Sequence, residues 1–182
     1  ALLREVFEDE PAYPAADQWL RDNLNHGNTH ITDFLDERYL KLGSFEDLVE
    51  VLEVKLRYLV DAGERSQLLI RIADLRNDEL NQPRQALGAL SLALREVPES
   101  FHLLDRMWEI GRQHSMWRDA GSLIRKSLQE SDPELKFQWF FRLAECARDE
   151  LEDLNESISS FEVCIGIEPE NIPSLRALDN LY

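Results

Sequence analysis

The chain contains nearly the same ten residues twice, RIADLRNDEL at 71–80 and RLAECARDEL at 142–151. The identical pairs are Arg71/Arg142, Ala73/Ala144, Asp78/Asp149, Glu79/Glu150 and Leu80/Leu151. The same offset of 71 residues also pairs Pro98 with Pro169 and Leu104 with Leu175. An echo of this extent predicts an internal repeat, in which each unit buries its apolar face against its neighbours.

Apolar residues recur at three- and four-residue intervals throughout the chain, and this spacing is typical of α-helices. In segment 83–97 the apolar stripe is Ala86, Leu87, Leu90, Ala93 and Leu94. Prolines lie between such segments or in their first turns, where the missing N–H matters least. We expect helices at about 2–9, 15–26, 31–42, 45–61, 65–80, 83–97, 101–113, 117–131, 134–151, 154–167 and 172–182.

Small residues on these helices predict close helix pairs. Two antiparallel helices of a hairpin approach closely only where one side chain is small. We therefore expect six small residues to be buried at contacts inside their hairpins. They are Ala73, Ala86, Ala93, Ala144, Ser157 and Cys164.

Two segments carry the spacing of a known repeat: Ala86-x3-Leu90 followed by Pro98, and Ser157-x3-Phe161 followed by Pro169. They resemble the tetratricopeptide repeat (TPR), a 34-residue helix-turn-helix unit with a small residue, then A-x3-F and a later proline. The resemblance implies an all-α, right-handed α-solenoid of antiparallel helix hairpins. The chain looks like a divergent array of the bacterial type, with alternating long and short repeats. In the weaker units, Asp36 and Trp108 stand where the family has Gly or Ala.

We expect a single solenoid over residues 1–182, built from a partial repeat at 1–28, repeats at about 31–61, 65–99, 101–133 and 136–170, and a partial repeat at 172–182. The chain begins without Met and stops at Tyr182 inside a periodic segment. It is therefore expected to be an excerpt of a longer protein. The terminal helix 172–182 would lack one covering layer, which favours a monomer or a weak dimer through that helix.

Three arginines, Arg71, Arg106 and Arg142, fall at the same position of their helices in the repeat alignment, a position that lines the concave groove in the family. An arginine row there could bind carboxylates or backbone carbonyls of a peptide or protein partner. Acidic residues follow three positions later in each helix, and they could equally pair with the arginines on the helix surface. These acids are Asp74, Glu109 and Glu145. Both interpretations are open.

Charge excludes some partners. The chain has 36 acidic and 20 basic side chains, a formal net charge of −16. Such a charge repels phosphate backbones and anionic lipids, so we expect no nucleic-acid partner and no membrane partner. No apolar run is long enough to span a bilayer, and the N-terminus lacks the features of a signal peptide. The expected compartment is the cytoplasm.

Sequence motifs for catalysis and cofactors are missing. The chain has no phosphate-binding glycine loop, HExxH or G-x-S-x-G, and the prediction is no catalytic residue, no cofactor and no metal. His26, His30 and Asp33 have a superficial metal-ligand spacing, but Gly27 and Asn28 should break the helix between the histidines. The function predicted is a non-catalytic protein-interaction module. A regulatory or sensor domain of a larger signalling protein is the alternative.

Two further patterns have structural explanations. Helical lytic transglycosylases use a Glu-Ser pair, and this chain has Glu99-Ser100, Glu130-Ser131 and Glu156-Ser157. Each pair sits at an expected helix boundary, where serine is a common cap, and no glycine-rich stretch follows it. Cys146 and Cys164 lie on the two helices of one expected hairpin and could be neighbours. Packing residues are favoured over a redox pair, because buried cysteine usually behaves as a small hydrophobe.

Overall fold

The computed structural model describes residues 19–20 and 29–182. These residues form helices and their connections, with no strand among them. Two expected helices, 2–9 and 15–26, and the partial repeat 1–28 lie outside the described residues, apart from Trp19 and Leu20, which are helical. None of the described helices combines the length and the apolar composition needed to cross a membrane. The chain divides into two compact units, Ala1–Glu64 and Arg65–Tyr182.

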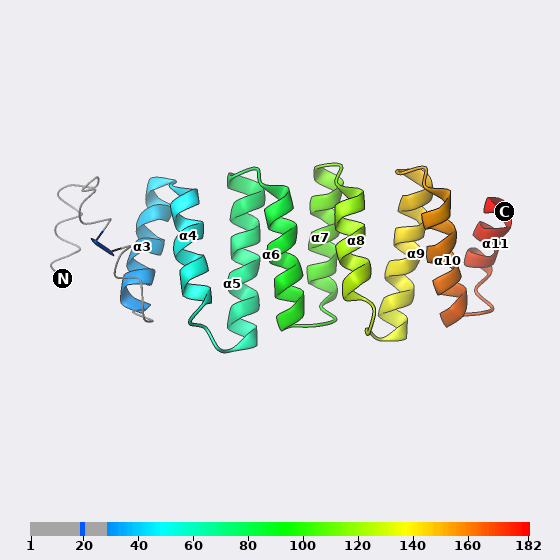
Figure 1. Ribbon diagram of the computed structural model, residues 1–182, viewed down its shortest axis with the longest axis horizontal. Coiled ribbons are helices and arrows are strands. Elements are labelled where there is room, and N and C mark those ends of the chain that lie inside the picture. Colours follow the sequence, from blue (N-terminus) through cyan, green and yellow to red (C-terminus); the bar gives the residue numbers. More distant parts are fainter. Residues whose placement is uncertain (1–18, 21–28) are drawn as a thin grey trace. The chain divides into compact units, whose positions relative to one another are not determined.

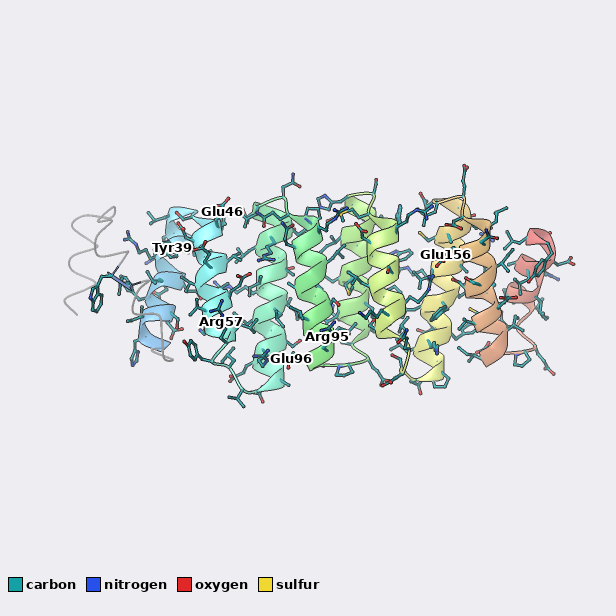
Figure 2. All side chains as sticks on the ribbon, in the orientation of Figure 1. Tyr39, Glu46, Arg57, Arg95, Glu96 and Glu156 are labelled. Atoms are coloured by element: carbon teal, nitrogen blue, oxygen red, sulfur yellow. The ribbon has the colours of Figure 1, made fainter. Side chains whose placement is uncertain are left out.

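The first unit contains a helix hairpin formed by α3 (Thr29–Leu42) and α4 (Phe45–Leu56). Its described core includes Leu35, Tyr39, Leu48 and Leu52, none more than 2% exposed. Gly43 makes the turn with a φ of +67°, a conformation that glycine adopts without strain. Figure 2 labels Tyr39 on α3 and Glu46 on α4.

The second unit is a stack of antiparallel helix hairpins (Figure 1). Its elements are α5 (Ala62–Asp74, crossing the unit boundary), the π-helix η1 (Leu75–Glu79), α6 (Pro83–Glu96), α7 (Phe101–Gln113), α8 (Trp117–Ser127), α9 (Pro133–Asp149), α10 (Leu154–Ile167) and α11 (Ile172–Leu181). Helices adjacent in the chain pack together, and α6 also packs against α8. The expected all-α solenoid of antiparallel hairpins is confirmed. We call α5, α7, α9 and α11 first helices, and α6, α8 and α10 second helices.

Several helix ends differ from the expectation. Segment 45–61 was expected to be helical, but α4 ends at Leu56 because i→i−3 bonds from Arg57 and Tyr58 tighten its last turn. Segment 117–131 is helical only to Ser127. There the Ser127 hydroxyl donates to the Ile124 carbonyl at 2.7 Å. It competes for this carbonyl with the backbone N–H groups of the helix.

The six small residues expected at hairpin contacts are all buried. Ala73, Ala86, Ala93, Ala144, Ser157 and Cys164 are each 0% exposed. Their burial confirms the small-residue pattern in the two echo hairpins, α5–η1–α6 and α9–α10. In the α7–α8 hairpin, Trp108 was aligned with the small position, but Gly111 makes the close contact. A Cβ on Gly111 would lie 2.7 Å from the Ala120 Cβ.

Each first-to-second turn of the second unit contains one left-handed residue. Asn81, Ser115 and Glu152 have φ values of 50°, 54° and 52°. The following N–H then bonds back into the first helix: Gln82 to Arg76 at 2.6 Å, Met116 to Gly111 at 2.7 Å and Asp153 to Ala147 at 2.8 Å. These bonds satisfy carbonyls that would otherwise be unpaired at the helix ends.

Candidate functional site

Arg106 on α7 reaches back to the preceding first helix. Its Nε and Nη2 donate to Asp74 Oδ1 at 3.2 and 2.8 Å, and Nη2 also approaches Asp78 Oδ2 at 3.4 Å. Glu109, the acid three residues later, instead accepts from Arg112 at 2.7 and 2.9 Å. The arginine therefore joins two hairpins rather than pairing along its own helix.

Arg142 on α9 repeats this connection one hairpin further on. Its Nη1 donates to Asp105 Oδ1 of α7 at 2.9 Å. The guanidinium carbon also lies 4.5 Å from the Trp108 ring centroid and 5.1 Å from the Trp139 centroid, within cation–π range. The side chain is 37% exposed, and its Nε and Nη2 have no hydrogen-bond partner among the described residues. These two nitrogens can therefore donate hydrogen bonds to an acceptor group of a ligand.

The rings beneath Arg142 belong to an aromatic cluster. Trp139 lies 5.6 Å from Phe101 and 6.0 Å from Trp108, and Trp108 lies 5.0 Å from Trp117, between ring centroids. Trp139 is 1% exposed, and its buried Nε1 finds no acceptor among the described residues. An unsatisfied buried donor typically costs about 1–3 kcal/mol. The sequence prediction missed this cluster, although three of the four tryptophans fall between 108 and 139.

Asn77 strengthens the link between α7 and the π-helix η1. It is 7% exposed. Its Nδ2 donates to Asp78 Oδ1 at 2.6 Å and, more weakly, to Gln113 Oε1 at 3.4 Å, while its Oδ1 lies 3.0 Å from His114 Nε2. We define the first-helix face as the surface formed by the bridging charged residues of α5, η1, α7 and α9. These residues are Asp74, Asp78, Asp105, Arg106 and Arg142, and the buried rings of Trp108 and Trp139 lie against Arg142.

Two further candidate residues lie on α5 and α9. Arg71 is partly buried in the last turn of α5, and Glu145 is exposed on α9. The structure thus brings Arg106 together with Asp74, and it leaves Glu109 with Arg112. Arg142 gains partners that the sequence prediction did not name, because its contacts come from residues far away in the sequence.

The second helices are bridged by a separate row of ion pairs. Arg84 of α6 approaches Asp119 of α8 at 3.3 Å, and Arg118 of α8 approaches Asp153 at 3.1 Å. Arg125 of α8 contacts Glu156, which is labelled on α10 in Figure 2. Arginine ion pairs between helices are therefore a general feature of this stack, and an ion pair alone does not mark a binding site. Cation–π contact with two tryptophan rings distinguishes Arg142.

Residues of two Glu-Ser pairs, Glu99-Ser100 and Glu156-Ser157, contact other helices or their connections. Ser157 is fully buried and donates to the Ala144 carbonyl at 2.9 Å, while Glu156 is held by Arg125. Glu99 accepts from the Asp132 backbone N–H at 2.9 Å, and Ser100 occupies the N-cap position of α7 without a side-chain capping bond. These serine and glutamate positions follow from packing and helix ends.

The two cysteines are not neighbours. Ser157 lies opposite Ala144, and the Cys164 Sγ lies 3.8 Å from the Phe137 carbonyl, which fixes how α10 runs along α9. Cys146 is nine residues from Phe137 (146 − 137) along the same helix, a rise of about 13 Å. A disulfide needs Cα atoms about 4.4–6.8 Å apart. Burial, together with the nearby negative charge of Glu150, raises the pKa of the Cys146 thiol to about 11. Burial likewise raises the pKa of the Cys164 thiol to about 11.

The histidine motif offers no metal geometry within the described residues. His30 is exposed at the start of α3, and the Asp33 carboxylate accepts from Lys55 Nζ at 2.8 Å. His26 lies outside the described residues. Over the part of the chain that the structure describes, no three His, Cys, Asp or Glu side chains gather as metal ligands would.

No protein-family model matches the chain, and no curated protein matches it by sequence. Among solved structures, a crystal structure of MamA protein is 14% identical, with 85% of this chain and 80% of that chain covered and a TM-score of 0.44. A MamA RS-1 ArsTM double mutant is 15% identical, with coverages of 84% and 82% and a TM-score of 0.45. MamA 41-end from Desulfovibrio magneticus RS-1 is 15% identical, with the same coverages and a TM-score of 0.43. Likeness at this level adds nothing to what the helices of the chain show directly.

Proposed function

We propose that this chain is a non-catalytic module of the tetratricopeptide type that binds a protein or peptide partner on its first-helix face. Arg142 carries the proposal. Its guanidinium is held over two tryptophans, bonded to one carboxylate through one nitrogen, and still 37% exposed. Arginine and tryptophan are the residues most enriched at binding hot spots, where rigid aromatic anchors surround a directional donor.

The expected ligand group is a carboxylate or a backbone carbonyl of a threaded segment. Two Arg142 nitrogens can donate to it, and the contacts with the two indole rings and with Asp105 hold the guanidinium in place, which favours a directional bond. Arg106 is already bonded to Asp74 and approaches Asp78, so it fixes the spacing of α5 and α7 more than it contacts the partner. The same helices also carry Arg71 (α5), Glu109 (α7) and Glu145 (α9), which would contact a longer ligand.

The test uses peptides selected on the immobilised full chain from a random phage-displayed library. Arg106→Gln together with Arg142→Gln should lower the affinity of the chain for the selected peptides by about tenfold or more. Losing a charge-assisted contact commonly costs more than 1 kcal/mol. The matched control is Arg84→Gln together with Arg118→Gln. This pair removes the same charge and the same kind of inter-helix ion pair from the second helices.

Thermal unfolding of both double variants separates binding from folding. Equal losses of affinity in the two variants, at unchanged helical content, would assign the effect to net charge and overturn the proposed face. Unchanged affinity in the first variant would move the binding surface to the second helices or to the edges of the hairpins. The Arg142 cluster would then have only the structural task of joining α7 to α9.

A further inference from the structure

Phe101, the first residue of α7, is an exposed aromatic residue beside the Arg142 cluster. It is 50% exposed, and its ring centroid lies 5.6 Å from that of Trp139. Trp139 is only 1% exposed, and the Arg142 guanidinium carbon lies 5.1 Å from the centroid of the same ring. Phe101 and Arg142 therefore form part of the outer layer over one buried indole.

The helix register sets the spacing between Phe101 and Arg142. Phe101 and Asp105 are four positions apart on α7 (105 − 101), and Trp139 and Arg142 are three positions apart on α9 (142 − 139). Residues at these spacings are neighbours on one face of a helix. Phe101 contacts Trp139, and Asp105 bonds to Arg142 at 2.9 Å. The two contacts are thus successive steps of one contact between α7 and α9, separated by about one helical turn of 5.4 Å.

Phe101 and Arg142 offer a ligand two kinds of contact. The exposed part of the Phe101 ring can pack against an aromatic side chain in an offset or edge-to-face arrangement. The Nε and Nη2 groups of Arg142, which have no partner among the described residues, can donate to an oxygen. An extended chain covers about 3.3–3.6 Å per residue, so groups one helical turn apart are matched by positions about two residues apart in a bound segment.

The charges around Arg142 favour a neutral acceptor group. Asp105 already pairs with the guanidinium, and the bridging charged residues of the first-helix face comprise three aspartates and two arginines. The whole chain has a formal net charge of −16. A ligand carboxylate would therefore be repelled at long range, whereas a backbone carbonyl has no net charge and is not repelled.

We propose that the partner segment on the first-helix face carries an aromatic residue, which packs on Phe101, about two positions from a backbone carbonyl that accepts from Arg142. This inference rests on the proposed function and adds the chemistry that the segment presents. A second copy of the chain is disfavoured as the partner, because two molecules of net charge −16 repel each other. The expected partner is a protein with a neutral, extended segment that contains an aromatic residue.

The test uses the peptides selected on the immobilised full chain, with affinities measured by fluorescence anisotropy. We expect the selected sequences to be enriched in Trp, Tyr or Phe and not in Asp or Glu. Replacing the aromatic residue of a selected peptide by Ala should lower its affinity for the native chain at least tenfold. The same replacement should change the affinity for the Phe101→Ala chain by less than about twofold, because the two residues that contact each other are then both absent.

Two further variants of the chain serve as controls. Phe101→Leu keeps an apolar side chain but removes the ring, so it should lower the affinity less than Phe101→Ala does, by about threefold. Leu154→Ala truncates a residue of similar exposure, 52%, on α10 and should stay within about twofold. Circular dichroism and thermal unfolding of each variant check folding, since Phe101 also covers Trp139.

Salt dependence tests the nature of the acceptor. Raising the NaCl concentration from about 0.05 M to about 0.5 M should change the affinity by less than about threefold, because screening acts mainly between charged groups. Replacing any Asp or Glu of a selected peptide by Asn or Gln should likewise stay within about twofold. A tenfold loss in either measurement would show that the acceptor is a carboxylate and would overturn the neutral acceptor.

The remaining outcomes separate this inference from the proposed function. Failure to select any peptide would overturn both of them. Peptides that need Arg106 and Arg142 but bind the Phe101→Ala chain as tightly as the native chain would overturn the aromatic contact and leave the proposed function standing. A dimer in sedimentation equilibrium that Phe101→Ala dissociates would make a second copy the occupant of this face.

Discussion

The α7–α8 hairpin and the α9–α10 hairpin bring their helices together by different means. In α9–α10 the contact uses Ala144 and Ser157, with a hydrogen bond of 2.9 Å from the serine to the alanine carbonyl. In α7–α8 the close contact is between Gly111 and Ala120, and the Gly111 carbonyl also accepts the closing bond of the turn. The close approach thus lies nearer the end of the first helix in α7–α8, at Gly111, than in α9–α10, at Ala144.

One extra residue at the turn accounts for this difference. In α7–α8 the closing bond joins Met116 to Gly111, five positions apart (116 − 111). In α9–α10 it joins Asp153 to Ala147, six positions apart (153 − 147), and α5–η1–α6 repeats this with Gln82 and Arg76. The additional residue widens the end of the first helix, as a π-turn does. A wide turn tolerates alanine at the accepting position, whereas the narrow turn requires glycine.

The largest expected change in stability is at Gly111, in the narrow turn of α7–α8. Gly111→Ala should lower the free energy of unfolding by about 1–3 kcal/mol, because its Cβ would overlap the Ala120 Cβ and force α7 and α8 apart. Gly88→Ala is the matched control on α6, where a Cβ meets nothing within 4 Å, and it should stabilise by about 0.5–1 kcal/mol. Chemical denaturation measures both changes.

A double variant sharpens that comparison. Ala120→Gly in the Gly111→Ala background removes the opposing Cβ and should recover part of the loss, since residues in contact show coupled effects. Equal destabilisation with and without Ala120→Gly would show that the overlap is not the cause.

The sequence predicted those parts of the fold that depend on spacing along one helix. The small residues of the echo hairpins were identified because Ala73, Ala86 and Ser157 recur at a fixed offset. Gly111 was missed, since the alignment by Arg106 placed Trp108 at the contact and no local signal reports a narrower turn. The partners of Arg142 were missed for a related reason. Asp105 and Trp108 meet it only after α7 and α9 are packed.

A smaller effect is expected at the left-handed turn residue of α9–α10. Glu152 is exposed and has a φ of +52°, a conformation disfavoured by about 1–2 kcal/mol for residues with a Cβ. Glu152→Gly should therefore stabilise by about 1 kcal/mol, measured by thermal unfolding. The neighbouring Glu150 is right-handed, so Glu150→Gly should destabilise by about 0.5–1 kcal/mol. Destabilisation by both substitutions would place Glu152 in an ordinary helical conformation.

The smallest effect tests whether the two echo hairpins are interchangeable at their contact. Ser157→Ala creates the residue present at the equivalent position Ala86 and removes the bond from Ser157 Oγ to the Ala144 carbonyl. The loss should be only about 0.5 kcal/mol, at the low end for a hydrogen bond, because the helix still provides that carbonyl with a donor. Ser157→Val, which adds volume at a 0% exposed site, should cost about 1–3 kcal/mol and serves as the contrast. If Ser157→Ala were as damaging as Ser157→Val, the hydroxyl would be essential to α9–α10. The two hairpins would then share their sequence echo but not the interaction that closes them.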